Sequence, residues 1–465
     1  MVSGLSVSKI SINQAVEVPL TAGTDVPVVS GRPGLVRVSV VPDSDWTPRE
    51  VVAELGLETG QGESPPIHAR RWVGGGSVDG DLSTTFNFEL PGAMLDADSR
   101  FGVSLHEASG IRLGPASPNA VRPAHGRASF GAESSGAALR IVLVPLLYHA
   151  DASGRLPQLG SEQVASHREA LRSRYPTPKV EIRVHDPVAF NGVVSPNGEG
   201  WGEVLQLLLM RRNQDRSEGL AEASEYYYGL VAPSPSFELY CADNPVCVLG
   251  LSTPQADPDS EFARGAVGLG FAGKQFSETL THEIGHAHGR LHAPCAPLGF
   301  IQNVDPEFPH AGGAIGAWGY DPKTGTLFGP DQAWDFMGYC EPAWVSDYTW
   351  RALFDRIGHV NGTTTGEKLG AGGEPMWMVS LDGRGGATPG SRVEFEKRPR
   401  GQPRTLEVRG DDSRLRRQVR AEFFAYSHLP GGFLLVPEPR PGDRSIRVDG
   451  TEIRWTAAGI PLLSP

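Results

Sequence analysis

The segment from His282 to His292 constrains the fold of this chain more than any other part of its sequence. His282 and His286 are four residues apart, so on an α-helix their imidazole rings lie on one face, and Glu283 lies on the same edge. Gly289 can adopt the left-handed conformation that ends a helix, which a side chain would resist. The turn that follows brings His292 back towards the first two rings. The segment therefore predicts a helix that ends at Gly289 and a loop that gathers three histidines.

Three neutral histidines gathered in this way are typical of a catalytic zinc site, because they leave one position of the ion open for water. Zinc lowers the pKa of that water towards neutrality, and a neighbouring carboxylate can take its proton and later pass it to the leaving amine. We therefore expect one catalytic Zn2+ held by His282, His286 and His292, with Glu283 as the general base. Five such fixed positions arise by chance on the order of once in ten thousand sequences. This rarity disfavours surface histidines on an amphipathic helix.

Three other histidines are given no role at the metal. His288 points away from the ligand face of the helix, so we expect it to be exposed to solvent. His310 and His359 have no partner at metal-binding spacing and are expected to be structural.

The pattern His-Glu-x-x-His-x-x-Gly-x-x-His resembles the metzincin clan of metalloproteases, whose second signature is a methionine turn below the zinc. A matching segment, Asp335-Phe-Met337-Gly-Tyr339-Cys340, lies downstream. The resemblance implies that Met337 forms an apolar floor under the ligands. It also implies that Tyr339 binds zinc or stabilises the tetrahedral intermediate, as a tyrosine does in astacin-like and serralysin-like members.

The resemblance covers about residues 139–360 and implies a zinc helix beneath a mixed sheet, whose edge strand pairs with an extended substrate. The segment Gly265–Phe271 is the candidate for that edge, and an internal strand is an equal alternative. Within the clan, the segments Tyr227-Tyr-Gly-Leu-Val, Gly268-Leu-Gly and Trp344-Val-Ser-Asp-Tyr-Thr look most similar to the StcE-like secreted proteases of glycoproteins. The expected substrate is therefore a protein or a glycoprotein.

Glycine and proline are frequent in the chain (58 and 39 of 465 residues), and many short Val-rich runs alternate with turns, which favours sheets at both ends. We expect a multidomain chain: an α+β metzincin-like catalytic domain flanked by N-terminal and C-terminal all-β, sandwich-like domains. The expected bounds are 1–136, 137–362 and 363–465, with glycine-rich linkers between them. The zinc helix should begin near Ser277.

All four cysteines lie in the stretch that also holds the three histidines: Cys241, Cys247, Cys295 and Cys340. Four cysteines permit three pairings. The local pairs Cys241 with Cys247 and Cys295 with Cys340 are favoured, although four reduced thiols remain an alternative. Two disulfides would imply an oxidising compartment, so we expect a secreted protein. A signal peptide is not visible at the start of the sequence, and we expect it to have been removed.

The formal net charge of −12 and the lack of a basic stripe argue against nucleic acid as a partner. No apolar run is long enough to cross a membrane. We expect a monomer. One rival function is a glycan-binding or surface-binding protein with a structural zinc, which predicts a fourth protein ligand. Another is a protease toxin with one intracellular target.

Some metzincins are held inactive by a cysteine of a propeptide, but no cysteine precedes Cys241 in this sequence. An acidic ligand from the N-terminal part, such as Asp81, is a weaker candidate for that role.

Overall fold

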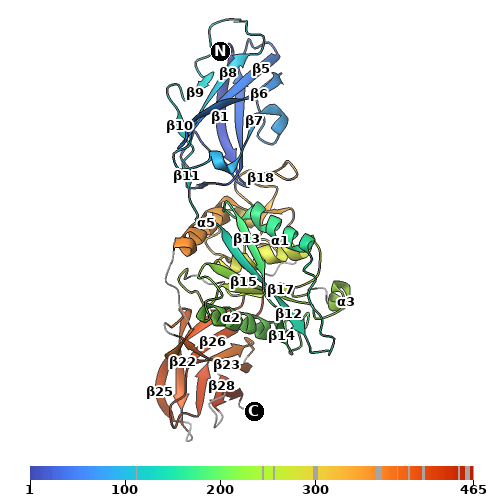
Figure 1. Cartoon of the computed structure of the whole chain (residues 1–465), viewed down its shortest axis with the longest axis vertical. Helices are drawn as coiled ribbons and strands as arrows, with labels where there is room; N and C mark the ends of the chain where they lie inside the picture. The colour runs from blue at the N-terminus through green and yellow to red at the C-terminus, as the bar shows by residue number, and fades with distance from the viewer. Residues whose placement is uncertain are drawn as a thin grey trace.

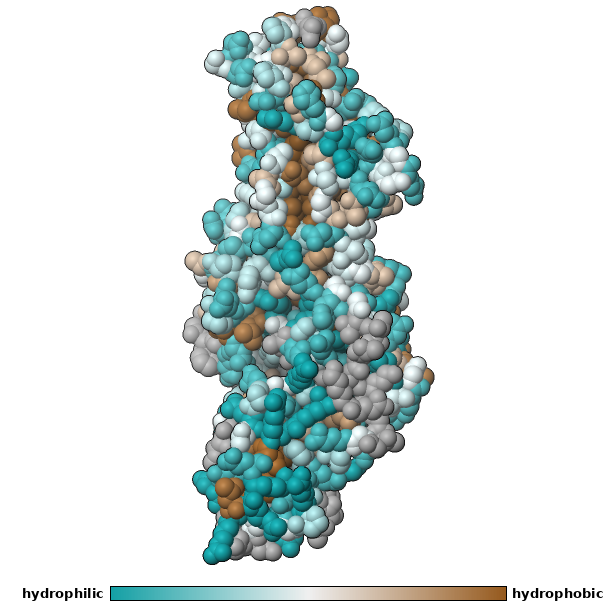
Figure 2. Space-filling model, turned by 90° about the vertical axis from the view of Figure 1, so that its left-hand side faces the viewer, coloured by the Kyte–Doolittle hydropathy of each residue, from teal (hydrophilic) through white to brown (hydrophobic). Residues whose placement is uncertain are grey.

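The protein is elongated, and the computed structural model describes it except at residues 112, 243, 245, 255–256, 297–301, 363–368, 385, 396–397, 411–413, 449–450, 456–460 and 464–465. Three parts follow one another along the long axis, with the two termini at opposite ends (Figure 1). Figure 2 shows one side of this stack, where hydrophilic side chains predominate and an apolar strip runs along the N-terminal part.

The N-terminal part consists of two antiparallel sheets that share one apolar core. Alternating residues of facing strands fill it, as expected for sheets with one solvated face: Val36, Val38 and Val40 come from one sheet, and Val51, Ala53 and Leu55 from the other. One sheet contains β2 (Glu17–Pro19), β1 (Leu5–Asn13), β4 (Gly34–Pro42) and β7 (Phe86–Leu90). The other contains β10 (Ala128–Ser129), β8 (Arg100–Glu107), β5 (Arg49–Thr59), β6 (Gly62–Val73) and β9 (Val121–Arg122). A short pair, β3 (Val28–Val29) and β11 (Ala132–Glu133), lies beside them.

The central part is a mostly parallel sheet with helices on both faces. Its strands run in the order β13 (Val180–Val184), β12 (Leu139–Tyr148), β15 (Glu225–Val231), β17 (Gly265–Leu269) and β16 (Gly250–Ser252), and β14 (Val188–Phe190) also pairs with β12. Only β16, at the edge, is antiparallel to its neighbour. The helices are α1 (Ser161–Arg174), α2 (Trp201–Ser217), α3 (Phe237–Cys241), α4 (Lys274–Ala287) and α5 (Asp347–Gly362). Short pairs follow α4: β18 (Gly319–Asp321) with β19 (Thr326–Phe328), and β20 (Trp334–Asp335) with β21 (Ala343–Trp344).

Strand β12 shows why this sheet has helices on both faces. Its residues other than Arg140 are apolar or aromatic, so both of its sides must be buried. Val142 and Val144 pack in one core with Trp201 of α2. Ile141 and Leu143 point the other way, into a second core formed with α1, α4 and α5. The helix that carries the histidines is therefore held against one face of the sheet.

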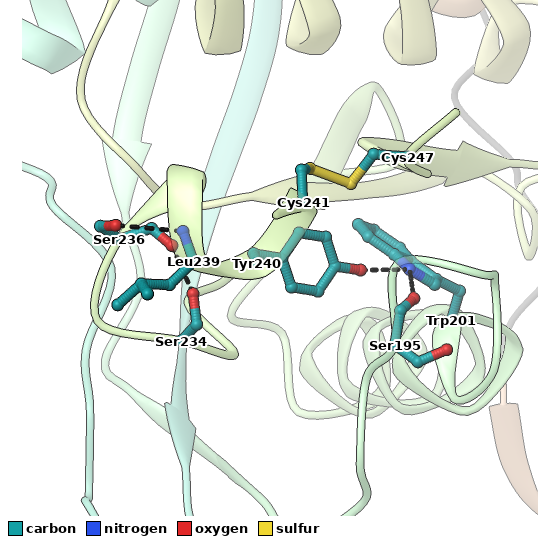
Figure 3. The surroundings of a disulfide bond; sticks show 8 residues. All are labelled: Ser195, Trp201, Ser234, Ser236, Leu239, Tyr240, Cys241 and Cys247. Atoms are coloured by element: carbon teal, nitrogen blue, oxygen red, sulfur yellow. Dashed lines mark hydrogen bonds between the residues drawn. A yellow bond between two sulfur atoms is a disulfide. The ribbon is translucent and has the colours of Figure 1, made fainter. Parts of the chain in front are cut away.

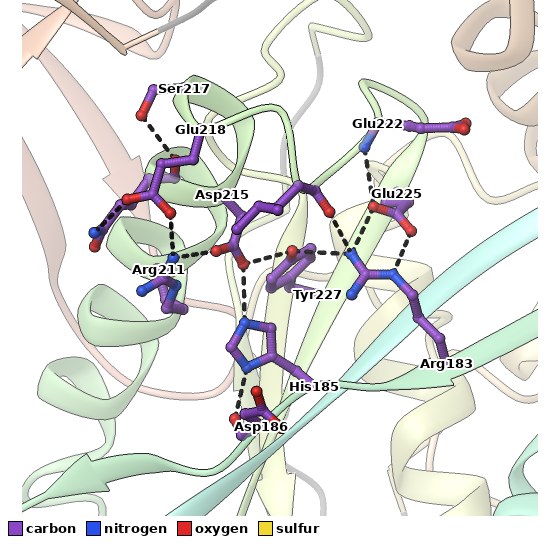
Figure 4. A network of polar contacts seen from close by, with 12 residues as sticks. Arg183, His185, Asp186, Arg211, Asp215, Ser217, Glu218, Glu222, Glu225 and Tyr227 are labelled. Carbon is purple, nitrogen blue, oxygen red and sulfur yellow. Dashed lines mark hydrogen bonds and ion pairs between the residues drawn. The ribbon is translucent and has the colours of Figure 1, made fainter.

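A buried carboxylate fixes α2 to the central strands. Asp215 of α2 accepts a hydrogen bond of 2.7 Å from the hydroxyl of Tyr227 on β15, and the same oxygen lies 3.2 Å from Nε2 of His185 (Figure 4). Arg211 pairs with the other oxygen, and Arg183 of β13 pairs with Glu225 at 2.7 Å. Because these groups satisfy one another, the network needs no ligand to explain it.

The C-terminal part is one eight-stranded sheet whose end strands also contact each other, so the sheet approaches a closed barrel. Its strands are β22 (Leu369–Leu381), β23 (Ala387–Phe395), β24 (Gln402–Arg409), β25 (Leu415–Ala425), β26 (Gly432–Pro437), β27 (Ser445–Val448), β28 (Thr451–Trp455) and β29 (Pro461–Leu463). Met376, Phe424 and Phe433 of this sheet share a core with α2, which lies between the two sheets.

These findings correct the expected fold class. An α+β metzincin-like catalytic domain between two sandwich-like domains is wrong, because the chain is mostly β, with 38% strand against 18% helix. No compact α+β metzincin core is present in the parts of the chain that the structure describes. Helices lie on both faces of the central sheet instead of being segregated, and the C-terminal sheet curls towards a barrel. Residue periodicity marks the strands, but it does not determine whether a sheet closes on itself.

One local expectation also changes. The histidine helix begins at Lys274, earlier than Ser277. Of the two alternatives for the segment Gly265–Phe271, the internal strand is correct, because β17 lies between β15 and β16. The expected boundary after residue 362 falls on residues outside the described ranges. Within those ranges, no helix is long and apolar enough to cross a membrane.

Candidate metal centre

Helix α4 lies against one face of the central sheet and holds His282 and His286. It packs against β15, β16, β17 and α1, and His282, Glu283 and His286 are all buried. The helix ends at Ala287, and Gly289 has a φ of +86°, the left-handed conformation expected from the sequence. The loop then returns, and His292 pairs with Asn303 and Asp305 through backbone hydrogen bonds.

The three histidines are oriented alike by hydrogen bonds on the side away from the site. Nδ1 of His282 lies 2.8 Å from the carbonyl of Phe336. Nδ1 of His286 and Nδ1 of His292 each lie 2.6 Å from a carbonyl, of Arg290 and Gln302 respectively. A carbonyl can only accept, so each Nδ1–H donates, and each Nε2 of the neutral ring carries a lone pair.

These three lone pairs converge. Nε2 of His286 lies 3.1 Å from Nε2 of both His282 and His292. With every ring proton on Nδ1, no proton remains to lie between these nitrogens, so their closeness favours a cation among them. Burial also keeps the rings neutral, because it lowers the pKa of His282 and of His292 to about 3. The side chains therefore fit a transition metal that takes imidazole ligands.

A fourth histidine, His428, joins the cluster from the hairpin between β25 and β26. The ligand atoms of the four histidines all lie within 4.8 Å of one another. His428 follows His292 at no recognisable spacing, so the sequence alone does not identify it. Its only signal is a lone histidine in a Ser-His-Leu-Pro-Gly-Gly turn, which by itself indicates no metal site.

The buried side chain of Glu283 lies beside the histidine cluster. Burial raises the pKa of its carboxyl to about 8. One carboxyl oxygen lies 2.6 Å from Nε2 of His428, and the other accepts a hydrogen bond of 3.4 Å from the hydroxyl of Ser427. Gly250 on β16 makes room for it, because a Cβ there would lie 2.7 Å from Cγ of Glu283.

Met337 lies directly beneath helix α4, buried with its sulfur close to Gly285. A Cβ at Gly285 would lie 2.4 Å from this sulfur. The turn is held by the buried carboxylate of Asp335, which accepts hydrogen bonds from the N–H groups of Met337 (2.8 Å) and Ser346 (2.9 Å). Met337 thus packs against helix α4 at Gly285, which lies between His282 and His286 in the sequence.

Tyr339 reaches the cluster from the same turn. Its hydroxyl lies 3.1 Å from Nε2 of His292 and 2.6 Å from Nδ1 of His428. The side chain of Tyr339 is 46% exposed, but its hydroxyl end is desolvated against the cluster, and this together with nearby Glu283 raises the pKa of the phenol, which keeps it protonated. A disulfide between Cys295 and Cys340 joins the loop after His292 to the residue after Tyr339.

The second disulfide, Cys241 to Cys247, closes a short loop at the end of α3 (Figure 3). Tyr240, in α3 directly before Cys241, accepts a hydrogen bond of 3.1 Å from the indole N–H of Trp201 on α2. Both disulfides are the pairs favoured from the sequence. The chain from Val246 to Gly250 then lines one wall of a cleft of about 800 Å³, whose floor includes His282, Glu283 and His292.

The remaining candidates lie elsewhere. His288 is buried, not exposed as expected, and stacks on Tyr226 with ring centroids 4.0 Å apart. His310 pairs with Asp347 at 2.5 Å and His359 with Asp259 at 2.8 Å. Asp81 caps a short 3-10 helix, Leu82–Thr84, in the N-terminal part and is not in the histidine cluster.

Comparison with known proteins adds little. No family model matches the chain, and no curated protein matches its sequence. Among solved structures, a Bacteroides uniformis beta-glucuronidase is similar at 12% identity over 49% of this chain and 29% of that one, with a TM-score of 0.17. A putative beta-galactosidase from Bacteroides fragilis is similar at 13% identity over 52% of this chain and 35% of that one, with a TM-score of 0.15. The chain thus spans about a third of the length of these proteins, and similarity this low carries no argument.

Proposed function

We propose that this chain is a secreted zinc-dependent endopeptidase that hydrolyses proteins or glycoproteins. The observation that carries the proposal is the buried carboxyl of Glu283 beside three converging histidine nitrogens, at the floor of a cleft. A site that only holds a metal for stability has no need of that carboxyl. The resemblance of residues 282–292 and 335–340 to the metzincin signatures supports the same reaction.

Zinc fits the donors better than magnesium or calcium would, because imidazole nitrogens suit zinc whereas those two ions prefer oxygen. When bound, zinc supplies a Lewis acid that activates water and stabilises negative charge on the scissile carbonyl. His282, His286 and His292 would hold it, each oriented by its Nδ1 hydrogen bond to a carbonyl.

The chemistry of the chain's own side chains follows from their positions. Glu283 would accept the proton of the attacking water and later donate it to the leaving amine. Burial raises the pKa of this carboxyl to about 8 in the metal-free site, and a bound cation would lower it towards the ionised form that accepts the proton. Tyr339, whose phenol stays protonated, would donate a hydrogen bond to the carbonyl oxygen as charge develops on it.

The edge strand β16 suits an extended peptide. It is antiparallel to β17 and lies at the rim of the sheet, so the chain before it can pair with a substrate backbone. The two disulfides are compatible with an extracellular protein, and they support secretion over action on an intracellular target.

A specific observation also favours a second function, a binding protein with a structural metal. His428 adds a fourth histidine to the cluster, and structural zinc sites are closed by four protein ligands. In that case the metal would hold the C-terminal sheet to the central sheet, and Glu283 would have no chemical role.

The variant Glu283→Gln separates the two functions. Cleavage of a proteome-derived peptide library, followed by mass spectrometry over long incubations, should fall by roughly 100-fold or more in the variant. Metal content should stay the same, because the amide replaces no ligand. Equal cleavage by both proteins would remove Glu283 from the reaction. An absence of cleavage by the wild type, by Glu283→Gln and by a variant that lacks His428 would favour the structural metal.

A further inference from the structure

We propose that His428 is the fourth ligand of the resting metal, and that the hairpin between β25 and β26 keeps the centre closed to substrate. This inference concerns the regulation of the site and rests on the proposed peptidase function. The signature segments, residues 282–292 and 335–340, supply no fourth imidazole to the cluster. It comes from a part of the chain that follows the histidine helix by more than a hundred residues.

The positions of the four rings are those of a closed site. The ring centroids of His282, His286 and His292 lie 4.7, 5.3 and 4.5 Å apart. The centroid of His428 lies 5.2, 5.0 and 4.8 Å from these three rings in the same order. Six nearly equal separations place the rings at the corners of a tetrahedron, which is the arrangement of a four-coordinate zinc site.

The nitrogens of His428 agree with this role. Nδ1 lies 2.6 Å from the hydroxyl of Tyr339, which can orient the ring as the carbonyls orient the other three. Nε2 is buried and lies 2.6 Å from a Glu283 oxygen, yet it makes no hydrogen bond of acceptable geometry. A buried nitrogen without such a bond is costly unless another partner takes its lone pair.

The same hairpin also covers part of the edge strand. The N–H of Ser427 donates to the carbonyl of Ser252 at 2.8 Å, and the N–H of Ser252 donates to the hydroxyl of Ser427 at 2.9 Å. These are backbone groups of β16 that a substrate backbone would otherwise use. The hairpin thus blocks two positions: His428 fills the fourth ligand position, and Ser427 occupies the backbone groups of Ser252 at the end of β16.

The hairpin is anchored on both sides of the site. Asn303, in the loop after His292, donates through its amide to the carbonyls of Tyr426 (2.8 Å) and Ser427 (3.1 Å). The Tyr426 side chain is buried in the core that α2 shares with the C-terminal sheet. These contacts favour the closed position of the turn. Opening requires the hairpin to be displaced, or His428 to be removed.

The test compares wild type with His428→Ala and His428→Gln, two variants without an imidazole at this corner. His125→Ala removes an exposed histidine of the N-terminal part and serves as the matched control. Each protein is loaded with Co2+ in place of the native metal, and its visible spectrum and metal content are recorded. Cleavage of the peptide library is then measured with zinc.

We expect both His428 variants to keep one metal per chain and to change the cobalt spectrum, because a nitrogen donor is replaced by water. Cleavage should rise by about tenfold or more, the inverse of the fraction of resting molecules that are open. The control should match wild type in both measurements.

An unchanged cobalt spectrum would overturn the proposal, because His428 would then not be a ligand. Loss of a cleavage activity that wild type shows would also overturn it, because His428 would then assist the reaction instead of closing the site. If the spectrum changes but no protein cleaves any peptide, the peptidase function itself is wrong, and the closure proposed on it falls with it.

Discussion

The imidazole nitrogens at the centre show how single residues determine its chemistry. In His282, His286 and His292, the Nδ1–H group donates a hydrogen bond to a backbone carbonyl, and Nε2 therefore carries a lone pair. The sequence identifies these residues through their spacing alone. It cannot identify His428, because the turn that carries it meets the site only after the C-terminal sheet packs against α2.

A buried histidine outside the centre gives a pH prediction. His167 on α1 contacts Ser277, and burial lowers its pKa to about 4. Between this value and the ordinary histidine pKa of about 6.5, the unfolded chain binds a proton that the folded protein does not. Stability therefore falls as pH falls through that range. At pH 5 the loss from this one residue is about 2 kcal/mol relative to pH 7.

The variant His167→Gln keeps a polar side chain that does not titrate. We expect the thermal midpoint of wild type to drop further between pH 7 and pH 5 than that of the variant. The other buried histidines contribute equally to both proteins, so the difference reports on His167. If the two midpoints fall by the same amount, His167 is not held neutral by the fold.

At the scale of elements, the turn at Met337 packs against helix α4, which holds His282 and His286. The sequence predicts the helix, the left-handed Gly289 and the methionine turn, because each depends on local residues. The start of α4 at Lys274 was missed, because Gly273 precedes it without a capping side chain. The internal position of β17 depends on pairing between distant strands, which periodicity does not reveal.

The variant Gly285→Ala tests this contact. In an exposed helix the change would stabilise the protein, but here the new Cβ would lie 2.4 Å from the sulfur of Met337. We expect a loss of about 1–3 kcal/mol from overpacking, seen as a lower thermal midpoint. Gly358→Ala in α5 is the matched control, since its Cβ would meet nothing closer than 3.8 Å. A stabilised Gly285→Ala would show that Met337 does not pack against this face.

At the scale of the whole molecule, the proposed site belongs to two parts of the chain. Helix α4 and the loop after it, in the central part, supply Glu283 and three histidines, and the C-terminal near-barrel supplies His428. The expected fold class failed at this scale, because residues that alternate in a strand do not specify how a sheet curls or which neighbour it meets. The structure brings His428 of the C-terminal part into the histidine cluster, where the sequence suggested only a flanking module.

The most direct test of this account is X-ray diffraction from crystals of the native protein above and below the zinc absorption edge. We predict one anomalous peak per chain that appears only above the edge and lies among the rings of His282, His286, His292 and His428. A peak elsewhere, a peak of another element, or no peak among these four rings would contradict the account.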